Sequence, residues 1–356
     1  MLWRFELKKT LINQKGVWIL LVCLLLKLVV LNVFPEQKDS RIRLSQKQYD
    51  KYLVQLQGEN TAEKSDWILT EYTNFKAIIG QGNQMREAYA AGEISKEEWE
   101  SYSKAYAEAE LKLNSATIFA EKAEQFLAQP QDLPPAHYIY EYGWQSVFTL
   151  QQFPDVFLLF GILLLTAQCF PAESQSGMMP VLLAARNGRW KLYRAKLGML
   201  LGICVVAFSI FGAAEWAVFQ QRGWMNDGDV PLYSITIFAK CPLNMTLLQG
   251  YVQCLWVRLF ATLAFTVLMF GLSVFLRSTT ESLFTGVCLL ALPMLWDGAV
   301  MLFTHSGLLR GTKLLLWLGE SGLPLWLPLA ISGAAVSLLP SWAGRDWRGE
   351  YKETVI

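Results

Sequence analysis

Long apolar runs recur along this chain of 356 residues and alternate with polar segments. A membrane-spanning helix needs about 20 mostly apolar residues, and in lipid the backbone must satisfy its own hydrogen bonds, which favours helices. The pattern therefore predicts an all-α integral membrane protein with six transmembrane helices. We expect these spans at residues 17–34, 154–170, 196–219, 250–276, 282–304 and 322–340.

A polar segment of residues 35–153 separates the first two expected spans and is long enough to form a domain. Ser95 and Glu98 have the spacing of a capping box, which predicts the start of a helix. Apolar residues then recur at steps of three and four, which predicts a helix with one packed face. This stripe comprises Trp99, Tyr102, Tyr106, Ala109, Leu113, Ala116, Ala120, Ala123 and Leu127, and a shorter one comprises Ile68, Tyr72, Phe75 and Ile79. We expect a helical domain in which the segment 80–84 and nearby turns join two antiparallel helices.

Residues 1–16 precede the first span and are basic and amphipathic. Trp3, Leu7 and Leu11 recur at helical spacing, while Arg4 and Lys8 supply positive charge. The pattern predicts an interfacial helix on the inner leaflet. An ordinary positively charged flank of the first span is the alternative.

The distribution of bases predicts the topology, because cytoplasmic loops of membrane proteins carry an excess of Lys and Arg. The loop 171–195 and the first residue of the following span carry one acid, Glu173, and five bases. These bases are Arg186, Arg189, Lys191, Arg194 and Lys196. We expect a multi-pass protein of the cell membrane with both termini in the cytoplasm, a cytoplasmic tail at 341–356 and the domain 35–153 outside. Topology alone is one explanation of the basic loop, and docking of a cytoplasmic partner is the other.

Three charged residues stand out inside the apolar runs: Lys27, Glu215 and Asp297. A lone charge in a bilayer is costly, so we expect Lys27 to pair with Asp297 or Glu215. The alternative is that the long Lys27 side chain reaches the outer interface by itself. Gly198 and Gly202 form a pair of small residues that predicts close helix packing.

Motifs for chemistry are missing from the sequence. It has no phosphate-binding glycine loop for ATP, and its two histidines, His137 and His305, form no zinc motif. Six scattered cysteines give neither a disulfide framework nor a metal pattern, and a net charge of +1 gives no signal for nucleic acid. We expect a protein that is not itself an enzyme and binds no cofactor.

Three features resemble the type-2 ABC export permeases, in the branch with a large external domain between spans one and two. The first is the order of basic start, span, insert and five spans, with the five-span domain at 154–340. The second is the turn Arg277–Ser278–Thr279 after span four. The third is the loop 171–195 with the first residue of the next span, whose matching residues are Glu173, Gly177, Arg186, Arg189 and Lys196.

The resemblance implies the transmembrane subunit of an ATP-driven exporter that moves an unidentified substrate outward. It implies that the five matching loop residues couple this subunit to a cytoplasmic ABC ATPase subunit. ATP and Mg would then be bound by that partner. It also implies a second permease subunit, either identical or a paralogue.

Two other functions are compatible with the sequence. A membrane sensor or scaffold would use the helical external domain to bind an envelope partner and would need no ATPase. A channel or ion-coupled carrier would favour several buried acids or broken helices at mid-membrane. A neighbouring gene for an ATPase would favour the exporter, and its absence would favour the sensor.

Overall fold

The computed structural model describes residues 2–130, 132–151, 155–177, 188–241, 243–276 and 278–295, and these residues are mostly helical. The chain divides into two compact units. The membrane unit comprises residues 1–35, 147–223 and the chain from 251 onward, and the hairpin unit comprises 36–146 and 224–250. Each unit has its own buried apolar cluster and is described separately.

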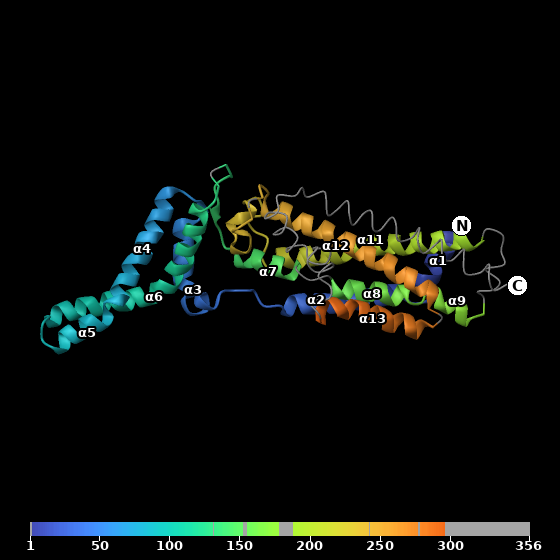
Figure 1. Ribbon diagram of the computed structural model, residues 1–356, viewed down its shortest axis with the longest axis horizontal. Helices are drawn as coiled ribbons and strands as arrows, with labels where there is room; N and C mark the ends of the chain where they lie inside the picture. The colour runs from blue at the N-terminus through green and yellow to red at the C-terminus, as the bar shows by residue number, and fades with distance from the viewer. Residues whose placement is uncertain are drawn as a thin grey trace. The chain divides into compact units, whose positions relative to one another are not determined.

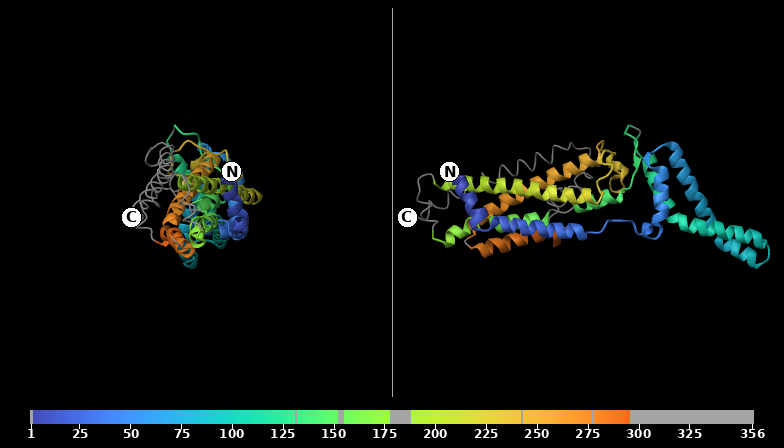
Figure 2. Two further views of the ribbon diagram at one scale, coloured as in Figure 1. Left: turned by 90° about the vertical axis from the view of Figure 1, so that its right-hand side faces the viewer. Right: turned by 180° about the vertical axis from the view of Figure 1, so that it is seen from behind.

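The membrane unit is a bundle of helices that run alongside one another (Figures 1 and 2). Helix α2 packs on α8 and α11, and α13 packs on α8. The apolar core between the helices includes Leu165, Phe170, Tyr193 and Phe270. The described elements of this unit are α1 (Leu2–Lys8), the π-helix η1 (Lys9–Asn13), α2 (Gly16–Val33), α8 (Val156–Thr166), α9 (Pro171–Gln175), α11 (Gly188–Gln221) and α13 (Thr279–Leu295). Two more helices, α7 (Tyr142–Gln151) and α12 (Leu247–Phe275), begin in the hairpin unit and continue into this one.

Among the described residues, four segments are long and apolar enough to cross a membrane. They are Gly16–Val33, Tyr142–Glu173, Lys191–Gln221 and Leu247–Val274, and they overlap the first four predicted spans. Helix α13 covers the first part of the predicted fifth span, with an apolar stretch at Thr279–Ala291. The predicted span 322–340 lies outside the described residues. Predicted and observed boundaries differ most for the second span, which the sequence predicted to begin at residue 154.

A tight turn separates the N-terminal helix from the first span. Lys15 adopts the left-handed backbone conformation, with φ of 58°. At Gly16, a Cβ atom would lie 2.6 Å from the carbonyl oxygen of Thr10 and 2.8 Å from a methyl group of Leu165. Only glycine fits this close approach of backbone to backbone. The predicted N-terminal helix therefore ends in a π-helical turn before α2 begins.

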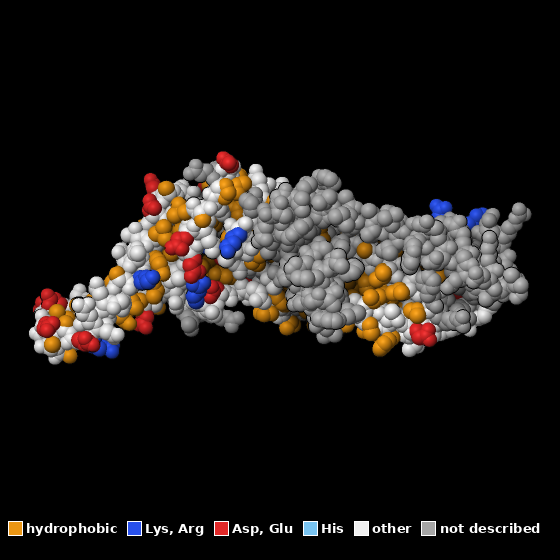
Figure 3. Space-filling model, viewed as in Figure 1, with side chains coloured by type: hydrophobic (Ala, Val, Ile, Leu, Met, Phe, Trp, Pro, Cys, Tyr) orange, Lys and Arg blue, Asp and Glu red, His pale blue; other side chains and the backbone are white. Residues whose placement is uncertain are grey.

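The hairpin unit is built from α3 (Ser40–Leu56), α4 (Ala62–Gly80), α5 (Gly82–Ala90) and α6 (Lys96–Leu127). The predicted capping box is present: the Glu98 backbone N–H donates to Ser95 Oγ at 3.2 Å, and the Ser95 N–H donates to the Glu98 carboxylate at 2.8 Å. Both α3 and α4 pack along α6. In Figure 3, acidic side chains gather around the end where α5 meets α6.

The structure refines the predictions for this unit. The segment 80–84 does not join the two long helices by itself, because α5 follows α4 almost directly and the chain reverses at residues 91–95. The predicted stripe is buried between Ala109 and Ala123, but Leu127 is exposed. Helix α3 was not predicted, although its Tyr49 stacks on Phe119 of α6 with 4.9 Å between ring centroids.

A short antiparallel pair of strands and one buried ion pair tie the hairpin unit together. Strand β1 (Gly58–Glu59) pairs with β2 (His137–Tyr138). Lys122 lies 3.0 Å from Glu141, and the second carboxylate oxygen of Glu141 accepts hydrogen bonds from the backbone N–H and hydroxyl of Thr236. The segment 224–250, which follows α11 and includes η2 (Leu232–Ser234) and η3 (Thr236–Phe238), is therefore part of this unit.

Candidate functional site

Four charged side chains meet among the helices of the membrane unit. Lys27 comes from α2, Asp155 from the residue before α8, Glu215 from α11 and Arg258 from α12, and all four are buried. With the amide of Gln151, these residues form what we call the membrane charge cluster. Two bases and two acids give the cluster a formal charge of zero.

Glu215 lies at the centre of the membrane charge cluster. Its carboxylate accepts hydrogen bonds from Lys27 at 2.5 Å, from Arg258 at 3.0 Å and from the Gln151 amide at 2.8 Å. The Lys27 ammonium also donates to Asp155 at 2.6 Å. Arg258 in turn donates to the Gln151 amide oxygen at 2.7 Å and lies 3.6 Å from Asp155.

The geometry matches what a low-dielectric environment demands of charged groups. Charges taken out of water must be paired and hydrogen-bonded, because an isolated charge in a membrane is expensive. The other oxygen of Asp155 accepts the backbone N–H of Leu158 at 3.1 Å and so caps the start of α8. The cluster therefore links α2, α8, α11 and α12, because each buried charge is neutralised by a partner from another helix.

The sequence anticipated only part of the membrane charge cluster. The structure joins Lys27 to Glu215, which is one of the two pairings that we expected, while Asp297 lies outside the described residues. Asp155 and Arg258 were not predicted from the sequence to belong to the cluster. Arg258 could have been predicted, because it is a charged residue in the middle of an apolar run. Asp155 could not, because its position at the start of a run is also that of an ordinary helix cap.

A second group of charges lies where the membrane helices meet the polar loop. One carboxylate oxygen of Glu173, on α9, accepts a hydrogen bond from Lys9 of η1 at 2.8 Å. The same oxygen forms an ion pair with Lys196 of α11 at 2.7 Å. Lys196 also donates to the carbonyl oxygen of Cys169 at 2.6 Å and lies 4.0 Å from Glu6 of α1. We call Glu6, Lys9, Glu173 and Lys196 the loop-end network.

The loop-end network is buried, and its charges also sum to zero. Glu6, Glu173 and Lys196 are buried, and Lys9 is partly so. Burial by itself lowers the pKa of Lys9, but the hydrogen bond to Glu173 and the negative charges of Glu173 and Glu6 together outweigh this and raise the pKa above its ordinary value. The network therefore holds the N-terminal segment, α9 and α11 together at one end of the bundle.

The five loop residues that the sequence singled out thus have different surroundings. Glu173 and Lys196 are paired with each other inside the bundle. Gly177 follows α9 with φ of 68°, a conformation that glycine adopts readily. Arg189 lies in the first turn of α11. Arg186 lies outside the described residues, so the structure does not bring all five together.

Neither charge group has the composition of a metal centre. Within the part of the chain that the structure describes, no group of three or more His, Cys, Asp or Glu side chains is arranged to hold a metal ion. Each carboxylate of the two groups is instead paired with a Lys or Arg side chain. That side chain would compete with a metal ion for the carboxylate oxygen atoms.

Comparison with known protein families agrees with this architecture. The family model described as ABC-2 family transporter protein matches residues 6–311. The chain belongs to the ABC-2 transporter family. Searches of curated proteins and of solved structures gave no significant match. As an ABC-2 permease, the chain is the transmembrane component of an ABC transporter, is embedded in a membrane and works with an ABC ATPase subunit.

Proposed function

We propose that this ABC-2 permease is the transmembrane subunit of an ATP-driven exporter of the cell membrane. In this proposal it has six spans, both termini are cytoplasmic and the domain 35–153 lies outside. The observation that carries the proposal is the family match across residues 6–311, which includes both charge groups and the basic loop. The excess of bases in the loop 171–195 and in the N-terminal segment supports the orientation.

The loop 171–195 is the proposed docking site for the ATPase, and ATP and Mg are bound by that partner. The loop-end network supports this role, because Glu173 of α9 is bonded to both Lys9 and Lys196. A displacement of the loop by the ATPase would then reach the N-terminal segment and α11 together. Packed elements joined in this way move as a unit.

Burial changes the roles that we propose for the loop residues. Glu173 and Lys196 are too enclosed to form the contact surface, so we assign them to holding the loop in place. Arg186 and Arg189 are the proposed contacts with the ATPase. Gly177 supplies the turn between α9 and the rest of the loop.

The complete exporter in this proposal contains two permease subunits and two ATPase subunits. The second permease is either a copy of this chain or a paralogue. Symmetric pairing of identical subunits is the commonest arrangement of soluble oligomers. The transported substrate moves outward and is unidentified.

Charge reversal in the loop tests the proposed docking. In the variant Arg186→Glu with Arg189→Glu, we expect the affinity for the ATPase subunit to fall by more than about tenfold, equivalent to about 1.4 kcal/mol. The measurement is co-purification of the ATPase with the permease, together with stimulation of ATP hydrolysis. The matched control is Arg86→Glu with Lys104→Glu, which makes the same charge change at exposed positions of the hairpin unit.

Two outcomes separate the alternatives. Unchanged complex yield and unchanged stimulation in the loop variant, with normal membrane insertion, would rule out docking at this loop. Failure of any ATPase to co-purify with the unaltered chain would instead favour the sensor or scaffold.

A further inference from the structure

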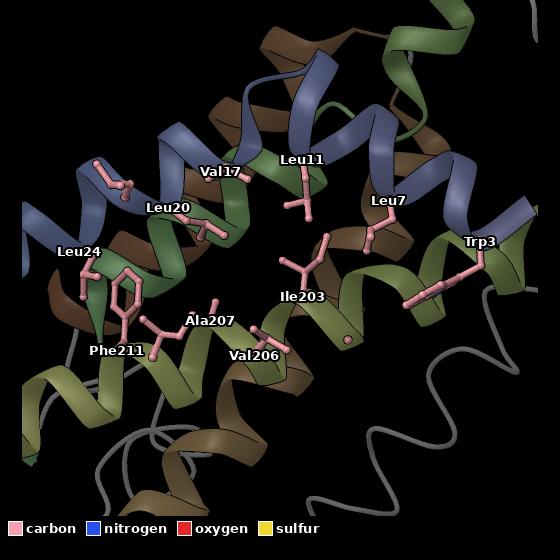
Figure 4. Close-up of a pocket in the computed structure, with 13 residues that line it drawn as sticks. Trp3, Leu7, Leu11, Val17, Leu20, Leu24, Ile203, Val206, Ala207 and Phe211 are labelled. Carbon is pink, nitrogen blue, oxygen red and sulfur yellow. The ribbon is translucent and has the colours of Figure 1, made fainter.

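A groove in the membrane unit lies between the N-terminal helices and α11 (Figure 4). Trp3, Leu7 and Leu11 line one wall, and Val206 and Phe211 line the facing wall. Its volume is about 540 Å³, which is within the range of roughly 300–1,000 Å³ typical of sites for small molecules. All 13 of its described lining residues are apolar.

The groove is preformed rather than a loose gap. The wall that carries Trp3, Leu7 and Leu11 is held at its base, because Lys9 in the same segment is bonded to Glu173. Helix α1 also packs directly against α11. Gly202 leaves the space open, since the nearest group to a Cβ atom there would be the Trp3 ring at 3.8 Å.

The predicted close packing at Gly198 and Gly202 is therefore wrong for the described part of the chain. A Cβ atom at Gly198 would meet no described atom within 4 Å. The small side chains leave room beside α11 in place of a tightly packed helix.

The exposed rim of the groove is apolar, as expected of a surface that faces hydrocarbon rather than water. Its walls belong to α1, η1, α2 and α11, and the last two lie in segments that are long and apolar enough to span the bilayer. Val206 is 60% exposed and Ile210 is 52% exposed on α11, and Leu21 is exposed on α2. Filling so apolar a space with water is unfavourable, because water needs several polar partners.

Helix α1, which forms part of one wall of the groove, also carries exposed positive charge. Arg4 and Lys8 are exposed on α1, next to the lining residues Trp3 and Leu7. Bases at a membrane surface attract anionic headgroups, and Trp side chains favour the level of the headgroups. A molecule that combines an apolar chain with an anionic head matches both parts of this surface.

We propose that the groove binds one acyl chain of an anionic phospholipid, with the headgroup phosphate at Arg4 and Lys8. The site belongs to the leaflet in which α1 lies. This inference does not depend on the docking of an ATPase, because it uses only the bundle and its N-terminal helix.

Photo-crosslinking in nanodiscs tests the proposal on the full chain. The probe is phosphatidylglycerol with a diazirine in its acyl chain, at a trace level in phosphatidylcholine. Labelled peptides are located by mass spectrometry. We expect label on the lining residues of 1–24 and 202–211, and we expect excess unlabelled phosphatidylglycerol to remove it.

Groove-filling and charge variants define the two parts of the site. Val206→Trp should reduce labelling of the lining residues by about tenfold or more, as expected when a pocket loses its space. Val205→Trp is the matched control, because Val205 is the neighbouring exposed residue and does not line the groove. Arg4→Gln and Lys8→Gln should each reduce the preference for phosphatidylglycerol over a phosphatidylcholine probe by about fivefold.

Three results would overturn the proposal. Label spread evenly around α2 and α11, without competition, would show only bulk lipid. Equal labelling by the anionic and zwitterionic probes would exclude the headgroup site. A photoreactive amino acid at Leu7 that crosslinks to protein instead of lipid would assign the groove to a second copy or to another segment of this chain. The competition arm uses the unaltered chain, so it decides the question even where a variant fails to fold.

Discussion

At the scale of single residues, the membrane unit places charged side chains where they have several partners. Glu215 has three hydrogen-bonding partners, and Lys27 is bonded to two carboxylates. Removing one member leaves the others buried with a net charge. Loss of one partner from a buried pair costs about 3–5 kcal/mol, whereas replacing both partners by apolar groups is often nearly neutral.

A double-mutant cycle on Lys27 and Glu215 tests this reasoning. We expect Lys27→Leu and Glu215→Leu each to destabilise the chain by about 3–5 kcal/mol. The double variant should be less destabilised than the sum, because Arg258 and Asp155 remain as a neutral pair. The measurement is the half-life of the folded protein in detergent at raised temperature.

The conservative variant Lys27→Arg is the control for that cycle, since it keeps the positive charge. Additive effects of the two leucine substitutions would show that Lys27 and Glu215 do not interact. Full stability of Lys27→Leu would show that the lysine needs no partner.

At the scale of elements, the turn between η1 and α2 determines how the N-terminal segment meets the bundle. Its geometry depends on a glycine, because the backbone of Thr10 occupies the space that a side chain at position 16 would need. The same turn keeps Lys9 within reach of Glu173. Local backbone geometry and the loop-end network therefore depend on each other.

Replacing Gly16 by alanine should disturb this turn. We expect a loss of about 1–3 kcal/mol, the usual cost of overpacking, and faster proteolysis around residues 10–16. Gly212→Ala is the matched control within α11, because a Cβ atom there meets no described atom within 4 Å. Alanine should be neutral or slightly stabilising at that position, since it is a better helix former.

Equal stability and equal proteolysis of Gly16→Ala and Gly212→Ala would contradict the role of the turn. A loss at Gly212 alone would point instead to contacts of α11 with another subunit.

At the scale of the whole molecule, the orientation that we propose in the membrane rests on the distribution of bases. Labelling of the native Cys241 with a thiol reagent cannot test this orientation, because the side chain is only 1% exposed. Introduced cysteines at exposed positions are needed. Glu93, in the turn between α5 and α6, and Lys8, on α1, are both exposed.

We expect a membrane-impermeant thiol reagent to label Glu93→Cys in intact cells, or in spheroplasts if an outer barrier exists. Lys8→Cys should be labelled only after lysis, because we propose that the positive N-terminal segment lies in the cytoplasm. The unaltered chain measures the background from the native cysteines. Labelling of Lys8→Cys in intact cells, with Glu93→Cys protected, would reverse the topology.

Much of the secondary structure of this protein was predicted from the sequence, because it depends on local patterns of residues. The first four spans were predicted from the length and composition of apolar runs, and the start of α6 from a capping box. Such features depend on a few neighbouring residues and on the solvent that surrounds them. The family resemblance rested partly on local motifs, and the match to residues 6–311 confirmed the ABC-2 permease family.

The tertiary structure decided which distant residues meet. Lys27 and Glu215 are 188 positions apart, and Lys9 and Glu173 are 164 apart. The sequence showed that such charges needed partners, but the choice among Asp155, Glu215 and Asp297 depends on how the helices rotate and stack. The groove beside Gly202 has the same origin, because an empty space is defined by the packing of several helices and by no single stretch of chain.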